Sequence, residues 1–377
     1  MRIHRPAALL AVALIAAALA AAPASASSTA ADVQRGLQGL VAAPGGPPGA
    51  IATLYKGGKL TVLRAGRADV RRPAAPRAGD HMRIASIAKA FSGAVALNLV
   101  RDGKLSLEDT VAERLPGMPV AWGKVTVGQL LGHTSGVPDY TESKAFAKHA
   151  EEHPRAYVRP LQIIDWVRHE PLNFKPGSDY RYSNTDNIIV GLIAEQVTGE
   201  AYGQLLQRIV FEPAGLGATS FPTTPAIPSP FIHGYLTEPE APPVDVSTLL
   251  SPSGAWASGA ILSTPRDLNA FIRADLGLRF FDRDQQRQQM RFFKGGESSP
   301  PGPGRNSAGL ALFRYQTKCG TVFGHTGNFP GYVQFAAATA DGKRAVTTSL
   351  NIPAPTGKLL AQLRRVQATA VCALLGR

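Results

Sequence analysis

YVQFAAATADGKRAVTTSL, residues 332–350, contains two runs of strand-forming residues, Tyr332 to Ala338 and Arg344 to Leu350, on either side of Asp341-Gly342. An Asp-Gly pair between two such runs is a favoured hairpin turn, because both residues tolerate the left-handed backbone that the turn needs. The stretch therefore predicts an antiparallel pair of strands near the C-terminus.

Other strand-like runs lie just upstream of this hairpin and at the other end of the chain. They are residues 51–55, 60–64, 310–315 and 321–323, and Gly57-Gly58 between the first two is a second hairpin signal. Apolar residues at helical spacing and capping signals predict a first helix near 33–41, a last helix over 358–374, and helices between them near 87–99, 161–167, 188–197, 205–211 and from 264 onward.

Strands at both ends with helices between them predict the α/β (α+β) class. We expect an antiparallel sheet flanked by helices, built from both chain ends, with an inserted, mostly helical region. The expected sheet region is residues 27–100 and 255–377, the expected helical region is 101–254, and together they form one catalytic unit over 27–377.

The first residues have the pattern of a secretory signal peptide. Arg2, His4 and Arg5 precede an apolar run from Leu9 to Ala22, and Ala24-Ser25-Ala26 is a small-residue cleavage site. The alternative is a membrane anchor, but the run is shorter than the roughly 20 apolar residues that span a bilayer. We expect residues 1–26 to be removed, the protein to be secreted to the cell envelope, and no transmembrane segment to follow.

The balance of charge is basic, at +13. For an exported protein, this favours anionic cell-envelope polymers or acidic substrates as partners over nucleic acid, although scattered surface arginines explain the charge equally well. Cys319 and Cys372 fit an oxidising compartment and could form a disulfide, the alternative being two free buried thiols.

Ser86-Ile87-Ala88-Lys89 lies where a short apolar stretch meets an expected helix. Positions i and i+3 share a helix face, so the Lys89 amine can approach the Ser86 hydroxyl. A serine alcohol is a weak nucleophile that needs a neighbouring base or positive field, and a partly desolvated lysine supplies either. Ser86 and Lys89 are candidate catalytic residues, although an N-cap serine followed by a surface lysine would give the same pattern.

Two other segments carry residues that could complete such a site. Tyr182-Ser183-Asn184 lies on a loop leading into a helix, and its phenol can shuttle a proton to a serine while its amide holds a substrate carbonyl or the lysine. His325-Thr326-Gly327 follows a strand, where a cation, a hydroxyl and a glycine at a sheet edge would let a peptide-like substrate lie alongside. The backbone N–H of Asn328 could join that of Ser86 in an oxyanion hole.

Together the three segments resemble the Ser-x-x-Lys, Tyr-x-Asn and Lys/His-Thr-Gly motifs of the penicillin-recognising serine enzymes. Residues 130–136 (LLGHTSG) and 174–184 (FKPGSDYRYSN) resemble segments of the same family, and the similarity extends over residues 30–375. With histidine in the third motif and two late cysteines, the chain is most similar to secreted D-alanyl-D-alanine carboxypeptidases of low molecular mass. Class C β-lactamases and related esterases are similar but usually carry lysine there.

The resemblance implies a β-lactamase/transpeptidase-like fold with the active site between its two regions. It implies an exported serine acyl-transfer hydrolase working through a Ser86 acyl-enzyme, with Lys89 or Tyr182 as the acylation base. The implied activity is carboxypeptidase action on peptidoglycan stem peptides, with a β-lactamase, a related esterase or a D-amino-acid peptidase as alternatives. No cofactor or metal is implied, and the residues expected to bind the peptide or β-lactam are Asn184, His325, Thr326, Gly327 and Asn328.

Recognition of a substrate carboxylate is where the chain departs from those peptidases. They use an arginine on the strand before the first late cysteine, whereas the spacing from Cys319 puts Phe313 at that position and Arg314 one residue later, on the opposite face of the strand. Arg314 is still the candidate for this role. His325 in place of lysine makes the charge of the third motif depend on pH, so an ester, an amide or another peptide is an alternative substrate.

Two rival interpretations have different chemistry. His149-Ala150-Glu151-Glu152-His153 matches the His-x-x-Glu-His pattern of some zinc peptidases, but Pro154 follows at once and the polar surroundings predict a solvated helix end. The non-enzymatic alternative is an envelope-binding module that has the fold without turnover.

Overall fold

The computed structural model describes residues 29–293 and 295–376. The predicted signal peptide lies outside these described residues. Within them, no helix combines the length and apolar character needed to cross a membrane.

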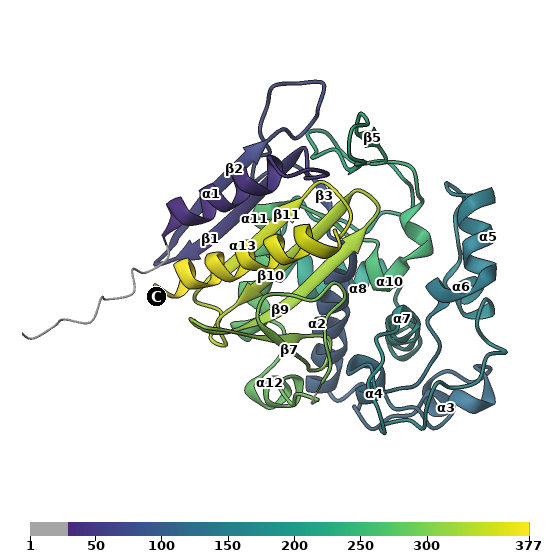
Figure 1. Ribbon diagram of the computed structural model, residues 1–377. Coiled ribbons are helices and arrows are strands. Elements are labelled where there is room, and N and C mark those ends of the chain that lie inside the picture. The colour runs from purple at the N-terminus through teal and green to yellow at the C-terminus, as the bar shows by residue number, and fades with distance from the viewer. Residues whose placement is uncertain (1–28, 294, 377) are drawn as a thin grey trace, which may run out of the picture.

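An antiparallel sheet of seven strands, in the order β2-β1-β11-β10-β9-β8-β7, forms the centre of the molecule (Figure 1). The first two strands come from the N-terminal part of the chain and the other five from the C-terminal part, which confirms the predicted fold class. The strands of this sheet are β1 (Gly49–Lys56), β2 (Lys59–Gly66), β7 (Arg305–Ala308), β8 (Phe313–Thr317), β9 (Gly320–Phe329), β10 (Tyr332–Ala338) and β11 (Ala345–Leu350). The short strands β3 (Met82–Arg83) and β6 (Leu262–Ser263) pair with each other, as do β4 (Tyr235–Leu236) and β5 (Val244–Asp245).

Both predicted hairpins are present, and β1 pairs with β11 so that the two ends of the chain meet in the sheet. All residues of β10 and β11 are buried, because helices cover both faces of the sheet. Two strands differ from their predicted bounds. The chain turns at Ala311 with a φ of 53°, so β8 begins only at Phe313, and β9 continues through His325-Thr326-Gly327 instead of ending before it.

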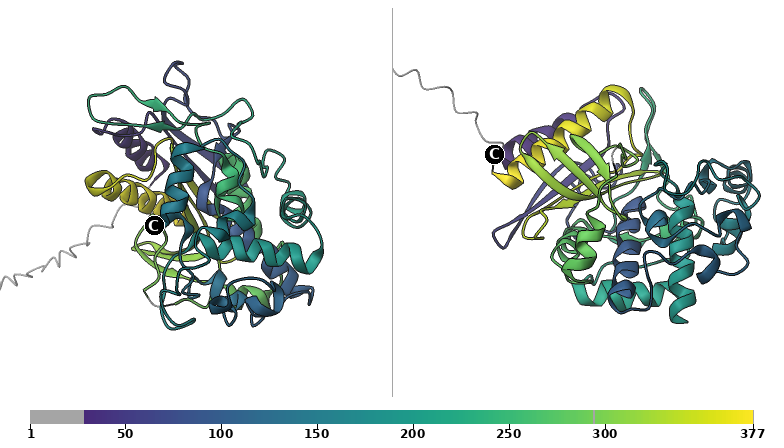
Figure 2. Two further views of the ribbon diagram at one scale, coloured as in Figure 1. Left: turned by 90° about the vertical axis from the view of Figure 1, so that its right-hand side faces the viewer. Right: turned by 90° about the horizontal axis from the view of Figure 1, so that it is seen from below.

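One face of the sheet is covered by α1 (Ala30–Val41) and α13 (Gly357–Leu375), which contact each other. The right-hand view of Figure 2 shows these two helices on one side of the sheet and the other helices on the opposite side. There α11 (Pro265–Leu276) packs against β1, β10 and β11. The sheet thus separates two hydrophobic cores, one beneath each helical layer.

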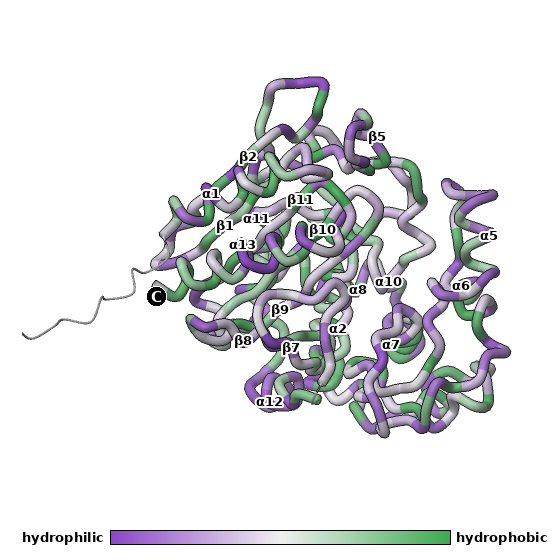
Figure 3. The backbone as a smooth tube through the Cα atoms, viewed as in Figure 1, coloured by the Kyte–Doolittle hydropathy of each residue, from purple (hydrophilic) through white to green (hydrophobic). Residues whose placement is uncertain are grey.

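The remaining helices lie between β3 and β7 in the sequence. They are α2 (Ala88–Arg101), α3 (Val111–Arg114), α4 (Val127–Leu131), α5 (Lys144–Glu152), α6 (Pro160–Asp165), α7 (Asn184–Thr198), α8 (Tyr202–Leu206), α9 (Glu212–Ala214), α10 (Trp256–Gly259) and α12 (Arg283–Gln289), with 3₁₀ turns η1 (Ala85–Ile87), η2 (Val120–Trp122), η3 (Tyr140–Glu142) and η5 (Pro252–Gly254) and a π turn η4 (Gln207–Phe211). Figure 3 shows that α12 is hydrophilic along its length, whereas hydrophobic residues concentrate in the sheet and the helices around it. The predicted limits of the helical region, residues 101–254, remain a prediction. Helices α2 and α10 lie outside these limits, yet both pack on α7, which lies inside them.

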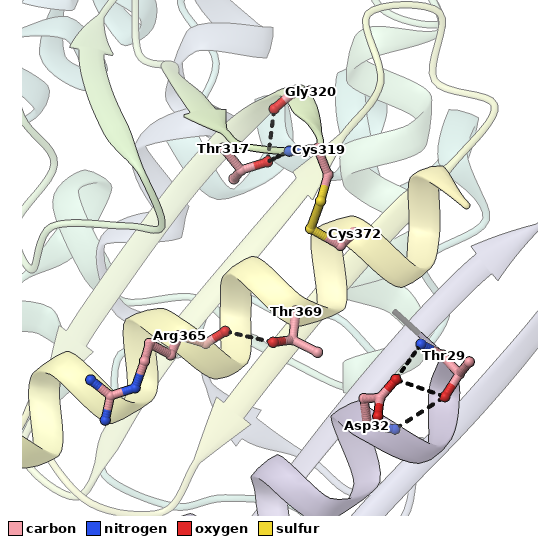
Figure 4. The surroundings of a disulfide bond; sticks show 8 residues. All are labelled: Thr29, Asp32, Thr317, Cys319, Gly320, Arg365, Thr369 and Cys372. Atoms are coloured by element: carbon pink, nitrogen blue, oxygen red, sulfur yellow. Dashed lines mark hydrogen bonds between the residues drawn. A yellow bond between two sulfur atoms is a disulfide. The ribbon is translucent and has the colours of Figure 1, made fainter. Parts of the chain in front are cut away.

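Cys319 and Cys372 form a disulfide that joins the turn between β8 and β9 to α13 (Figure 4). The linkage fixes the last helix to the strand that carries the third motif.

Candidate active site

Ser86 is in η1, directly before α2, in a segment held to the neighbouring β6 region by a hydrogen bond from Ile84 N to Ile261 O. Ala85 has a φ of 52°, a left-handed conformation that is costly for a residue other than glycine and that is often found at functional sites. Residues 82–90 are buried except Ser86, which is partly exposed. The strained turn therefore presents the Ser86 hydroxyl at the start of a buried helix.

Gly327 allows β9 to approach this turn closely. A Cβ atom on Gly327 would lie 2.4 Å from the carbonyl oxygen of Ile84 and 3.2 Å from the backbone nitrogen of Ser86. Only glycine fits there without a shift of the backbone. The glycine of the third motif therefore places the backbone of residue 327 next to the nitrogen of Ser86, a close approach that an oxyanion hole formed by Ser86 and the following Asn328 would need.

Lys89 lies one turn into the helix and is wholly buried. Its Nζ lies 3.1 Å from Ser86 Oγ and donates to Asn184 Oδ1 at 2.7 Å and to the backbone oxygen of Ser258 at 2.9 Å. Burial lowers the pKa of Lys89 to about 7, and Asp139 and Asp186 offset part of this effect. The amine is thus neutral in a large fraction of molecules near pH 7 and can accept a proton.

Tyr182 lies beside this pair. Lys89 Nζ is 4.9 Å from the centroid of its ring, and its buried hydroxyl lies close to that of Ser86. Burial raises the pKa of Tyr182 well above that of a free phenol, and the neighbouring Ser86 hydroxyl offsets this only in part. The phenol is therefore a proton donor or relay at neutral pH.

His133 and Asp186 form a buried polar pair beside the ring of Tyr182. His133 Nδ1 is 2.8 Å from Asp186 Oδ2, and Ser135 donates to Asp186 Oδ1 at 2.5 Å. Burial raises the pKa of Asp186 and lowers the pKa of His133. The His133 ring lies 4.5 Å from the Tyr182 ring, and its backbone oxygen accepts from Arg181 N at 3.0 Å.

Asn184, the first residue of α7, presents its two amide atoms to different partners. Its Oδ1 accepts from Lys89, and its Nδ2 donates to Asp139 Oδ2 at 2.8 Å. The structure therefore brings Ser86, Lys89, Tyr182 and Asn184 together from two separate segments of the chain.

His325 does not supply the cation that we expected at the third motif. Its side chain is wholly buried against Phe313, with ring centroids 4.9 Å apart, and its Nδ1 lies 2.5 Å from Thr326 O. Burial, reinforced by the charge of Lys89, lowers the pKa of His325 to about 3, so the ring is neutral at physiological pH. His325 lies in the buried middle of β9 and can support Tyr182, 6.4 Å away between ring centroids, but offers no positive charge to a substrate.

Arg314 also differs from its predicted role. Its guanidinium lies over the ring of Phe292, 4.6 Å from the centroid, and donates to Ser307 Oγ at 3.2 Å. It is absent from the cavity that contains Ser86. The physical reason is the one-residue offset on β8, which turns its side chain away from the site.

The side chains of Thr326 and Asn328 form hydrogen bonds with backbone atoms of two loops. Thr326 Oγ1 donates to Pro300 O at 2.8 Å, and Asn328 Oδ1 accepts from Ala354 N at 2.7 Å. β8 pairs with β9 only as far as Gly324, so within residues 29–293 and 295–376 β10 is the one strand paired with the later part of β9. That free edge matches the expectation of a substrate lying alongside β9, with Asn328 at the cavity.

A cavity of about 630 Å³ opens over Ser86, Tyr182, Asn184 and Asn328. Its far wall comes from η3, α5, the chain that follows α5 and the segment before η5, and its apolar lining residues are Tyr140, Phe146, Ala150, Ala156, Val158 and Leu250. Tyr140, Phe146 and Trp166 pack together with centroids 5.3–6.1 Å apart. The site thus joins a buried polar floor to an apolar wall.

His149 and His153 line the same cavity from α5 and its end. No residue of α5 is buried and His153 is exposed, in agreement with the predicted solvated helix end. Their ring centroids are 5.7 Å apart. Among the described residues, no group of three or more His, Cys, Asp or Glu side chains is arranged to hold a metal ion.

Two further contributors were not found from the sequence. Ser258 acts through its backbone oxygen, which no side-chain pattern can reveal. Asp139 was overlooked. It lies just after the 130–136 segment, but its burial and its hydrogen bond to Asn184 become visible only in the structure.

Comparison with known proteins places this geometry in context. The Beta-lactamase family model matches residues 28–370. Protein flp of Staphylococcus aureus (strain N315) is 30% identical over 183 residues, which are 47% of this chain and 35% of flp. Penicillin-binding protein 4* of Bacillus subtilis (strain 168) is 27% identical over 269 residues, 66% of this chain and 56% of that protein. The chain therefore spans about a third of the first relative and just over half of the second.

Solved structures match over almost the whole molecule. A D-stereospecific amidohydrolase from Streptomyces sp. has a TM-score of 0.79 and 31% identity, covering 89% of this chain and 98% of that one. The D-amino acid amidase from Ochrobactrum anthropi SV3, complexed with L-phenylalanine amide, has a TM-score of 0.78 at 24% identity, covering 90% and 97%, and supports the fold.

Proposed function

This chain belongs to the beta-lactamase family and is a serine hydrolase, and we propose that it cleaves amide bonds of small D-configured substrates through an acyl-enzyme on Ser86. The observation that carries the proposal is the wholly buried Lys89 amine, 3.1 Å from the Ser86 oxygen at the floor of a 630 Å³ cavity. No metal or cofactor takes part in the steps proposed.

Acylation begins with neutral Lys89 as the base. Ser86 Oγ attacks the substrate carbonyl carbon while its proton moves to Lys89 Nζ, and the carbonyl oxygen becomes an oxyanion held by the N–H groups of Ser86 and Asn328. The C–N bond then breaks as the oxyanion reforms the carbonyl. Tyr182 gives its proton to the departing amine and regains one from Lys89, which its raised pKa suits.

Deacylation uses the same groups in reverse. A water molecule attacks the ester carbonyl, its proton passes to neutral Lys89, and Ser86 leaves with a proton returned from that lysine. The products are the free acid and the regenerated serine.

The charges of the cavity favour an uncharged amide over a C-terminal carboxylate. Among the described residues lining it, Arg181 is the only lysine or arginine, and its guanidinium donates to Glu142 Oε2 at 2.7 Å and to Asn173 Oδ1 at 2.9 Å. His325 is neutral, and Arg314 lies elsewhere. A substrate carboxylate would have to displace Glu142 to gain a cation.

The preference for D-configured substrates is supported by similarity to the Streptomyces amidohydrolase, which is described as D-stereospecific. The apolar wall formed by α5 supports a substrate with a large apolar or aromatic group.

D-alanyl-D-alanine carboxypeptidase activity is the second candidate. The free edge of β9 beyond Gly324 favours it, because an extended stem peptide could pair there. Export to the cell envelope remains part of either proposal, and the Cys319–Cys372 disulfide is consistent with an oxidising compartment.

The test compares three substrates: the amide of an aromatic D-amino acid, its L-enantiomer, and a diacetyl-L-Lys-D-Ala-D-Ala peptide. We expect the highest kcat/KM for the D-amide and no turnover by Ser86→Ala. A higher value for the peptide would favour the carboxypeptidase, and full activity of Ser86→Ala would remove both candidates.

A further inference from the structure

We propose that Asp139 is a positioning residue that fixes the orientation of the Asn184 amide and thereby directs the lone pair of Lys89 at Ser86. The inference rests on the proposed acyl transfer through Ser86. It gives a specific task to the segment between residues 133 and 141, which contains no member of the three motifs.

The argument starts from the donors of Lys89. A neutral amine has two N–H donors and one lone pair. The oxygens of Ser258 and Asn184 can only accept, and they lie 2.9 and 2.7 Å from Nζ, so they take both donors. The lone pair is then left for the Ser86 hydroxyl at 3.1 Å, which is the direction that proton transfer requires.

This arrangement depends on which end of the Asn184 amide faces the lysine. The Ser258 oxygen belongs to the backbone of α10 and cannot exchange places with a donor. The Asn184 side chain can, because its oxygen and its NH₂ group have nearly the same shape. If the Asn184 amide rotated by half a turn, its NH₂ group would face Lys89 and compete with the Ser86 hydroxyl for the lone pair of the amine.

Asp139 prevents this rotation of the Asn184 amide. An ionised carboxylate can only accept hydrogen bonds, so the group 2.8 Å from its Oδ2 has to be the NH₂ end of Asn184. Its other oxygen accepts from Thr141 N and Thr141 Oγ1, both at 3.0 Å, which ties it to the start of η3. The residue is 7% exposed, so water competes little for these bonds.

The charges around Lys89 make the effect measurable. Asp139 and Asp186 raise the pKa of Lys89 against the effect of burial, while His133, His325 and Tyr182 face it in their neutral forms. Burial lowers the pKa of Lys89, and the negative charge of Asp139 partly offsets this effect. Removing that charge therefore lowers the pKa of Lys89 further.

The first variant is Asp139→Asn. Its new oxygen stays with the N–H of Thr141, so its NH₂ group faces the NH₂ group of Asn184 and turns that amide. We expect the acylation rate to fall roughly 10- to 100-fold and the acid limb of the pH–rate profile to move to lower pH. Asp165→Asn is the control, since it removes a carboxylate on α6 that pairs with Arg168 at the surface.

The second variant is the exchange Asp139→Asn with Asn184→Asp. Here the amide at 139 donates to the carboxylate at 184, whose other oxygen again accepts from Lys89. Asn184→Asp alone sets two carboxylates against each other and is expected to be slow. We expect the double variant to acylate about tenfold faster than Asp139→Asn, with its acid limb at higher pH than in the unaltered protein.

Acylation is followed by mass spectrometry of the acid-quenched protein, and each variant is checked for folding by thermal unfolding. Unchanged acylation and an unchanged acid limb in Asp139→Asn would overturn the inference, as would a double variant no faster than the slower single variant. If the unaltered protein itself forms no adduct on Ser86, it is the proposed function that fails, so the two failures are distinguishable.

Discussion

Lysine is normally a cation at the protein surface, but the surroundings of Lys89 make it a base. Its pKa is lowered to about 7 by burial, and two fixed oxygens and one hydroxyl take its hydrogen bonds. The sequence indicated that Lys89 and Ser86 share a helix face, but not that Lys89 is wholly buried, because burial depends on α7 and α10.

The pH dependence of kcat/KM follows from this pKa. Protonated Lys89 cannot accept the Ser86 proton, so activity is expected to rise with pH and reach half its plateau near the pKa of Lys89, about 7. Lys89→Arg keeps the charge but has no accessible neutral form, and should lose about 10³-fold in kcat/KM. A pH–rate profile checks this, and an acid limb at the ordinary pKa of a carboxyl group would contradict the role given to Lys89.

At the scale of elements, the close contact of β9 with η1 is the feature on which the oxyanion hole depends. Gly327→Ala places a methyl group 2.4 Å from Ile84 O. Because both partners are backbone, we expect β9 to move outward, with kcat reduced about 10²-fold and a lower Tm. Gly217→Ala, where no atom lies within 4 Å of the new methyl group, is the matched control. Equal behaviour of the two variants would argue against this contact.

The apolar wall from α5 is expected to set substrate preference. Phe146→Ala removes a lining ring packed on Tyr140 and Trp166, and should raise KM about tenfold for an aromatic amide while changing little for alanine amide. Leu161→Ala, on α6 and 57% exposed, serves as the control. Steady-state kinetics on the two amides decide the point, and an equal loss on both would exclude a pocket for the aromatic group.

For the whole molecule, the disulfide joins α13 to the sheet. It closes a loop with a sequence separation of 53 residues, for which the chain-entropy model gives about 4 kcal/mol of stabilisation. Reduction, or replacement of Cys319 and Cys372 by alanine, should lower Tm while leaving activity at 25 °C, because Cys319 lies at the opposite end of β9 from Asn328. Thermal unfolding with and without reductant tests this, and an unchanged Tm would contradict it.

The sheet was predictable from the sequence because its hairpins are local. The β10–β11 hairpin has a favoured Asp-Gly turn, and the β1–β2 hairpin has Gly57-Gly58, so both could be located without tertiary information. The full length of β9 could not, since pairing with β10 extends the strand beyond its own strand-forming residues.

The candidate site was predictable to the level of its motifs. Ser86, Lys89 and Tyr182 were named from their residue types and order, and the structure places them together. The expected charge of His325 was wrong, because its burial is a consequence of packing. The substrate-binding role of Arg314 was also wrong, although the one-residue offset had already indicated that its side chain faces away from the site. The link from Asp139 through Asn184 to Lys89 required coordinates, as its members are distant in sequence.

Peptide mapping of a rapidly acid-quenched reaction is the most direct test of acyl transfer through Ser86. The substrate would be a p-nitrophenyl ester of an N-acylated aromatic D-amino acid. We predict an added acyl mass on the peptide that contains Ser86, formed at a rate that rises with pH through about 7 and absent from Ser86→Ala. Turnover without this adduct, or an adduct on another residue that persists in Ser86→Ala, would contradict the account.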